Sequence, residues 1–207
     1  MKLVELKTSE FVETVASSAP APGGGSVAAI IGSLGSALAE MVCALSDKDD
    51  SKPEIAALKA EAKELKERLL VMTDRDTEAF LKVSDAFSMP KSTDEEKAAR
   101  SAAIQEGLSA CMDSPREVMR FSRDLIKVIE KISKDFNTNA ASDLGVAALS
   151  AETAAKGAWL NVLINAGSLK DKEKGASCQA ECQEILCEVE GIASEVYKNI
   201  VKEIVGE

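Results

Sequence analysis

Apolar residues recur at steps of three and four along most of this chain. The longest stripe, from Pro53 to about Phe87, is made of Leu58, Ala62, Leu65, Leu69, Met72, Ala79, Val83 and Ala86. This spacing places side chains on one face of an α-helix. Comparable patterns predict helices from about Ser9 to Ser18, Ser26 to Leu45, Ala141 to Ala166 and Asp171 to Ile204. The pattern predicts an all-α fold, a single bundle of six or seven helices over residues 1–207.

Two local signals divide the middle of the chain. Thr93 and Glu96 have the spacing of a capping box, so a helix is expected to begin there and to run to about Asp113. Because proline cannot donate the helical backbone hydrogen bond, Ser114-Pro115 is expected to end that helix and to start another, which reaches about Lys134.

The segment from Ser26 to Leu45 is almost entirely apolar or small and is long enough to span a membrane. Glu40 interrupts it, and much of it is alanine, glycine and serine, which disfavours a membrane span. Ala28, Gly32 and Ser36 fall on one face, where a second helix could approach closely. We therefore expect the central buried helix of a soluble bundle.

The predicted helix from Ala141 to Ala166 has two contrasting faces. One is apolar and consists of Val146, Leu149, Thr153, Leu160 and Ile164. The other is small or hydrogen-bonding and consists of Asp143, Ala147, Ser150, Ala154, Asn161 and Asn165. We interpret the second face as a shallow groove, with a water-facing surface as the alternative.

Composition narrows the chemistry. The formal net charge is −10, from 25 basic and 35 acidic residues, which disfavours nucleic acid and anionic membranes as partners. The chain has no histidine, so other side chains must carry out any acid–base catalysis. Its five cysteines suggest reduced thiols in a cytoplasm. The first ten residues lack the apolar core of a signal peptide. We expect no metal and no cofactor.

Three features could carry chemistry. Gly23, Gly24 and Gly25 precede the apolar helix, where backbone can approach a ligand, although a tight helix connection is the simpler interpretation. Asp76 interrupts an apolar seam and is either functional or a buried ion-pair member, for example with Arg100. Asp143 lies near a predicted helix start, where an acid is also favoured for its charge alone.

Several blocks of the sequence resemble the cyclodeaminase/cyclohydrolase family. They are Pro20-Ala21-Pro22-Gly23-Gly24-Gly25-Ser26, Asp76-Thr77-Glu78-Ala79-Phe80, Met89-Pro90-Lys91, Asn137-Thr138-Asn139-Ala140-Ala141-Ser142-Asp143 and Asn161-Val162-Leu163-Ile164-Asn165, in the family's order. Leu163 departs from the pattern, since many relatives are expected to carry a polar or basic residue there. The formiminotransferase domain is absent, so channelling within one chain is not expected.

The resemblance implies an all-helical homodimer that acts on a one-carbon derivative of tetrahydrofolate, without metal or cofactor. The reaction is either cyclodeamination, which forms methenyltetrahydrofolate and ammonia, or hydrolysis of methenyltetrahydrofolate. It implies catalytic roles for Asp143 first and Asp76 second. The implied substrate-binding residues are Gly23, Gly24, Gly25, Ser26, Lys91, Asn139, Ser142, Asn161 and Asn165. The alternatives are a non-catalytic folate-binding protein and a structural helical dimer.

Overall fold

The computed structural model describes residues 2–49 and 51–206, and in that range the secondary structure is helical throughout. The outermost residues of the predicted 1–207 domain lie outside the described range. The α-helices are α1 (Thr8–Ala16), α2 (Gly24–Ser46), α3 (Pro53–Ser88), α4 (Asp94–Ile132), α5 (Ala141–Ser168) and α6 (Lys172–Val205). Two short 3-10 turns, η1 (Leu3–Glu5) and η2 (Thr138–Ala140), precede α1 and α5. The all-α prediction is confirmed.

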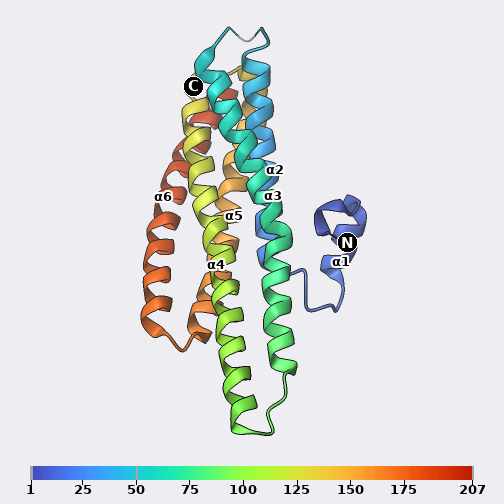
Figure 1. The fold of residues 1–207 in the computed structure, drawn as a ribbon. Coiled ribbons are helices and arrows are strands. Elements are labelled where there is room, and N and C mark those ends of the chain that lie inside the picture. Colours follow the sequence, from blue (N-terminus) through green and yellow to red (C-terminus); the bar gives the residue numbers. More distant parts are fainter. Residues whose placement is uncertain (1, 50, 207) are drawn as a thin grey trace.

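The five long helices lie side by side in an elongated bundle (Figure 1). Helix α5 packs against α2, α4 and α6, and α3 covers α2 and α4 on the other side. The short helix α1 stands apart from the bundle, at the right of Figure 1, and contributes no buried residue. The core therefore belongs to α2 through α6.

Helix α2 is held closely against α5 by small residues. A Cβ built on Gly32 would lie 3.2 Å from the Cβ of Ala154, and one on Gly35 would lie 2.8 Å from the Cβ of Ser150. Side chains larger than these would force the two helices apart. The prediction of a buried helix with a small-residue contact face is confirmed.

Among the described residues, α2 is the one helix long and apolar enough to cross a membrane, and 50% of its apolar window is buried inside the bundle. A core helix of a soluble protein passes the same test. Glu40, the acid that interrupts this helix, forms a salt bridge with Lys66 of α3.

The burial of the two faces of α5 is the opposite of what their polarity suggests. The small face is buried, with Ala147 and Ala154 both 0% exposed against α2. The bulky apolar face is turned outward, with Leu160 61% and Ile164 71% exposed. The interpretation of a groove along the small face is therefore wrong from Ala147 to Ala154, because close helix packing fills it.

Helix α4 runs without a break through Pro115, so the predicted restart at Ser114-Pro115 is wrong. Proline removes one backbone donor from the helix, which leaves the carbonyl of Cys111 four residues earlier without its usual partner. The side-chain Nδ2 of Asn165 on α5 donates to that carbonyl at 2.8 Å. The tertiary contact replaces the missing helical hydrogen bond. The predicted capping box at Thr93 and Glu96 is confirmed at the start of α4.

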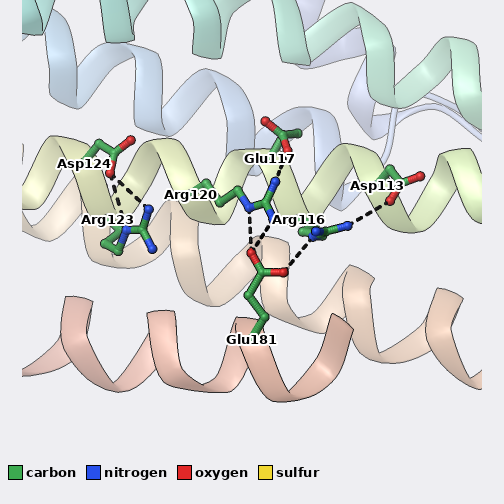
Figure 2. A network of polar contacts seen from close by, with 7 residues as sticks. All are labelled: Asp113, Arg116, Glu117, Arg120, Arg123, Asp124 and Glu181. Atoms are coloured by element: carbon green, nitrogen blue, oxygen red, sulfur yellow. Dashed lines mark hydrogen bonds and ion pairs between the residues drawn. The ribbon is translucent and has the colours of Figure 1, made fainter. Parts of the chain in front are cut away.

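A charged network joins α4 to α6 close to Pro115 (Figure 2). Arg116 Nε donates to Glu181 at 3.0 Å, and Arg120 Nε donates to the other carboxylate oxygen at 2.6 Å. Asp113 and Glu117 are the second partners of the two arginines. One α6 carboxylate thus fixes the α4 segment that contains the proline.

Candidate active site

A cavity of about 250 Å³ lies at the amino end of α2, where α2, α3, α4 and α5 meet. The glycine-rich turn forms one wall, and Asp76 and Thr77 of α3 form another. The remaining lining comes from Pro20, Ala21, Phe80, Cys111, Asn161, Ile164 and Asn165. The exposed side chains of Phe80 and Ile164 stand at its margin.

Asp76 is held against the first turn of α2. Its Oδ2 accepts a hydrogen bond from Ser26 Oγ at 3.3 Å, and Ser26 Oγ also contacts Thr77 Oγ1 at 3.2 Å. The first N–H groups of a helix lack helical partners and attract negative charge. The carboxylate can reach this turn because Gly25 has no side chain: a Cβ there would lie 2.5 Å from Cγ of Asp76.

Burial raises the pKa of Asp76 above its ordinary value, and hydrogen bonds from the side chain and backbone of Ser26 oppose that rise. Among residues 2–49 and 51–206, no cation contributes to this balance. Arg100, the partner considered from the sequence, instead donates to the carbonyl of Phe87. The ion-pair interpretation of Asp76 is therefore wrong for the described part of the chain.

Both asparagines of the cavity are tied to backbone through their nitrogen atoms. Asn161 Nδ2 donates to the carbonyl of Gly157 at 2.9 Å, and Asn165 Nδ2 donates to that of Cys111 at 2.8 Å. A carbonyl oxygen only accepts, so these bonds fix which way each amide is turned. The two amide oxygens remain available as acceptors. Together with Asp76, they suit a ligand that carries N–H donors or positive charge.

The structure brings together most of the site residues predicted from the sequence. Gly23, Gly24, Gly25, Asp76, Asn161 and Asn165 line the cavity, and Ser26 is bonded to Asp76. Thr77, Phe80 and Cys111 were missed. Thr77 and Phe80 lie in a sequence block that resembles the family, whereas nothing in the sequence pointed to Cys111.

Four other predicted residues lie elsewhere in the protomer. Lys91 is exposed in the turn between α3 and α4. Asn139 is exposed and bonds to Asn137, while Ser142 and Asp143 begin α5. Asp143 precedes Asn161 by 18 positions, which is roughly 27 Å along the helix at about 1.5 Å per residue. The structure of the single chain does not place Asp143 and Asp76 in a common cavity.

Two other hollows in the described part of the chain contain none of the predicted residues. One is an open groove of about 720 Å³ near Lys52 and Lys134. A second, of about 260 Å³, lies between α3 and α4 beside Arg75 and Lys82. The cavity at Asp76 is smaller than the groove but combines a buried acid with oriented amides, the arrangement that marks a site.

Known proteins are similar to this chain over most of its length. A family model described as formiminotransferase-cyclodeaminase matches residues 7–184. A methenyltetrahydrofolate cyclohydrolase of Methylorubrum extorquens is 38% identical over 198 residues, which cover 94% of this chain and 95% of that protein. The formimidoyltransferase-cyclodeaminase of Rattus norvegicus is 35% identical over 83% of this chain, which corresponds to 33% of the rat protein.

A solved structure is also similar over the full length. The crystal structure of formiminotetrahydrofolate cyclodeaminase from Thermotoga maritima has a TM-score of 0.79 and 30% sequence identity. The match covers 99% of this chain and 98% of that one. Residues from the glycine-rich turn to Asn165 all fall within the region that the family model matches.

Proposed function

This chain belongs to the formiminotransferase-cyclodeaminase family, and from this premise we propose that it is an enzyme that opens or closes the one-carbon bridge of methenyltetrahydrofolate. The observation that carries the proposal is the partly buried Asp76 carboxyl group in the cavity at the amino end of α2. Its pKa is raised by burial, which moves it toward the range in which a carboxyl group can exchange protons near neutral pH.

The chemistry of the bridge needs such a group. In methenyltetrahydrofolate a carbon between two nitrogens carries positive charge, and an ionised carboxylate nearby stabilises that charge. Asp76 accepts a proton from water as the oxygen bonds to this carbon. The tetrahedral intermediate then loses one carbon–nitrogen bond as Asp76 returns a proton to the departing nitrogen. The new hydroxyl group gives its proton to solvent by way of the Asp76 carboxylate and becomes the carbonyl, so hydrolysis releases one proton overall.

Cyclodeamination instead closes the one-carbon bridge. The folate nitrogen that carries no one-carbon group bonds to the carbon of the protonated formimino group and gives up its proton, which Asp76 passes to the amino group on that carbon. The bond to this amino group then breaks, and it leaves as ammonia. Hydrolysis is the first candidate, because the cyclohydrolase from Methylorubrum is 38% identical over nearly the whole of both chains. Cyclodeamination is the second, because the Thermotoga cyclodeaminase has the same length and fold. Neither reaction transfers electrons, so we propose that no metal or redox cofactor takes part.

One assay separates these reactions, since the methenyl compound has a chromophore that the open forms lack. Loss of that absorbance after addition of methenyltetrahydrofolate identifies a cyclohydrolase, and its appearance from formiminotetrahydrofolate identifies a cyclodeaminase. Asp76→Asn serves as the matched negative control. If the wild-type protein changes neither absorbance but is stabilised thermally by folates, it is a binding protein. If it shows neither effect, the folate assignment is wrong.

We also propose that the enzyme is a homodimer that pairs through α2 and α5. The two helices are antiparallel, since Gly32 faces Ala154 while Gly35 faces Ser150. Both helices also carry exposed apolar side chains, and we name this set the α2–α5 face: Leu34, Met41, Leu45, Val146, Leu149, Leu160 and Ile164, all at least 38% exposed. So many exposed large apolar side chains on two neighbouring helices of a chain of net charge −10 support an interface.

A two-fold axis across the α2–α5 face also explains why the predicted site residues separate within one protomer. If the two copies of α5 cross in opposite directions, the Asp143 end of one helix lies beside the Asn161 end of the other. The cavity of about 250 Å³ is below the roughly 300–1,000 Å³ of a typical ligand site, so a second wall is needed. We propose that the partner's α5 start supplies that wall.

We propose a cytoplasmic location from the state of the cysteines. All five are free, and four of them are buried as ordinary core side chains. Unpaired thiols of this kind persist in a reducing cytoplasm, where tetrahydrofolate chemistry would be expected.

A further inference from the structure

Pro115 is an unusual residue for its position, because it lies inside a 39-residue helix and is buried. Proline in a helix interior is strongly unfavourable relative to alanine. It withholds a backbone N–H, and its ring displaces the carbonyl four residues earlier from the helical direction. Here that carbonyl belongs to Cys111, which lines the cavity of the proposed active site.

The displaced carbonyl has a specific recipient. Asn165 Nδ2, from the facing helix α5, donates to it at 2.8 Å across 54 residues of sequence. This hydrogen bond turns the planar amide so that its nitrogen faces α4. Among the described residues no donor contacts Asn165 Oδ1, and this oxygen is not among the enclosed atoms without a partner. The oxygen is therefore open to the cavity that Asn165 lines.

The amide of Asn161 is oriented in the same way, but by a hydrogen bond within its own helix. Its Nδ2 donates to the carbonyl of Gly157 one turn earlier in α5, and its oxygen also has no protein donor in the described part of the chain. Thus the orientation of Asn161 depends on its own helix, whereas the orientation of Asn165 depends on the proline in α4.

We propose that Pro115 is a positioning residue of the active site. By leaving the Cys111 carbonyl without a helical donor, it fixes the Asn165 amide with Oδ1 toward the cavity, where this oxygen accepts an N–H group of the substrate's pterin ring. The inference rests on the proposed folate function for the identity of the ligand. The arrangement of Pro115, Cys111 and Asn165 is independent of that identity.

The test compares Pro115→Ala, Asn165→Ala and the double variant. Alanine at 115 restores the helical N–H, which competes for the Cys111 carbonyl. Pro115→Ala is expected to raise Tm and to lower kcat/KM roughly 10-fold through KM, the effect of one misdirected hydrogen bond. If Pro115 had only a structural role, replacing it would not raise Tm and weaken substrate binding in the same variant. In the Asn165→Ala background the proline change is expected to have no further kinetic effect. Pro53→Ala, at the first turn of α3, is the matched control and is expected to leave kcat/KM unchanged.

Unchanged kinetics in Pro115→Ala, or equal losses in the presence and absence of Asn165, would overturn the proposal. A second measurement does not need substrate: the side-chain amide protons of Asn165 are followed by NMR in the wild type and in Pro115→Ala. A large shift and faster exchange in the variant support the positioning role, and identical signals overturn it. If the wild type turns over no folate while these signals do change, the proposed function fails and the positioning role stands.

Discussion

The carboxylate of Asp76 occupies the space that a side chain at Gly25 would need. A Cβ on Gly25 would lie 2.5 Å from Cγ of Asp76, far inside van der Waals contact. The glycine-rich turn thus receives a carboxylate from within the protein, at the helix end where the sequence suggested that backbone can approach a ligand. This relationship ties the most distinctive sequence motif to the partly buried carboxyl group of the cavity.

Gly25→Ala is expected to inactivate the enzyme without unfolding it. The added methyl group forces Asp76 into another rotamer, so kcat should fall by about 10²-fold or more, as when a catalytic group is misplaced. Gly191→Ala in α6 is the control, since a Cβ there meets nothing within 4 Å. Turnover and Tm of both variants check this. An active Gly25→Ala protein would mean that the Asp76 position is unimportant.

Asp76→Asn is expected to reduce kcat by about 10²–10⁴-fold and to stabilise the fold at neutral pH. Burial raises the folded-state pKa of Asp76, so ionisation of this group disfavours the folded protein. The penalty is present above the folded pKa and disappears as pH falls toward the unfolded value of about 3.9. Melting curves from pH 7 to pH 4 should therefore show the variant's advantage shrinking with acidity. A constant difference in Tm would contradict this account.

Two inactive variants are expected to restore activity to each other if the site is shared between subunits. In a mixed dimer of Asp76→Asn and Asp143→Asn chains, one site carries both substitutions and the other carries neither. Random exchange makes half of the dimers mixed, so about a quarter of the sites become intact. Activity is measured before and after mild subunit exchange. No recovery, with exchange shown by mass-tagged chains, would exclude a catalytic Asp143 from the partner.

Leu34→Glu is expected to dissociate the dimer. Leu34 is 60% exposed on the α2–α5 face, and a pair of symmetry-related carboxylates there would be desolvated and mutually repelled. Val71→Glu on α3 is the control, since Val71 is 57% exposed and lies outside that face. Light scattering should give a monomer mass for the first variant and an unchanged mass for the second. A monomeric wild type would remove the dimer proposal entirely.

Glu181→Gln is expected to lower Tm at neutral pH while leaving kcat unchanged, because Glu181 lies outside the cavity. Partial burial alone would raise the pKa of Glu181, but Arg120 and Arg116 hold it below its ordinary value. Such a group stabilises the fold above its unfolded pKa of about 4.3, and the contribution is lost as pH falls through the folded pKa. The difference in Tm between wild type and variant should therefore narrow in acid. The effect should be small, since about a third of each side chain is solvent-exposed.

The sequence by itself determined the helices and the composition of the site. The three-and-four periodicity, the Thr93 cap and the glycine-rich turn are local signals, and they placed five of the six α-helices correctly. With the family resemblance, the sequence also identified half of the twelve residues that line the cavity. The local signals did not reveal that α4 continues through Pro115, since the donor that compensates the lost hydrogen bond is Asn165, 50 residues further along the chain. A rule based on neighbouring residues cannot identify a hydrogen-bond donor that reaches the site only when α5 packs against α4.

Only the tertiary structure decided which face of α5 is buried and which acid lies in the cavity. Small residues allow α2 and α5 to approach closely. Ala147 and Ala154 are therefore buried between the helices, whereas the larger and more hydrophobic Leu160 and Ile164 are exposed. Asp76 lies at the amino end of α2 because Gly25 leaves room for it. Asp143 lies in the first turn of α5, about 27 Å along that helix from Asn161, which lines the cavity. Periodicity shows which residues share a face of a helix, but the packing of the helices against each other decides which face is buried.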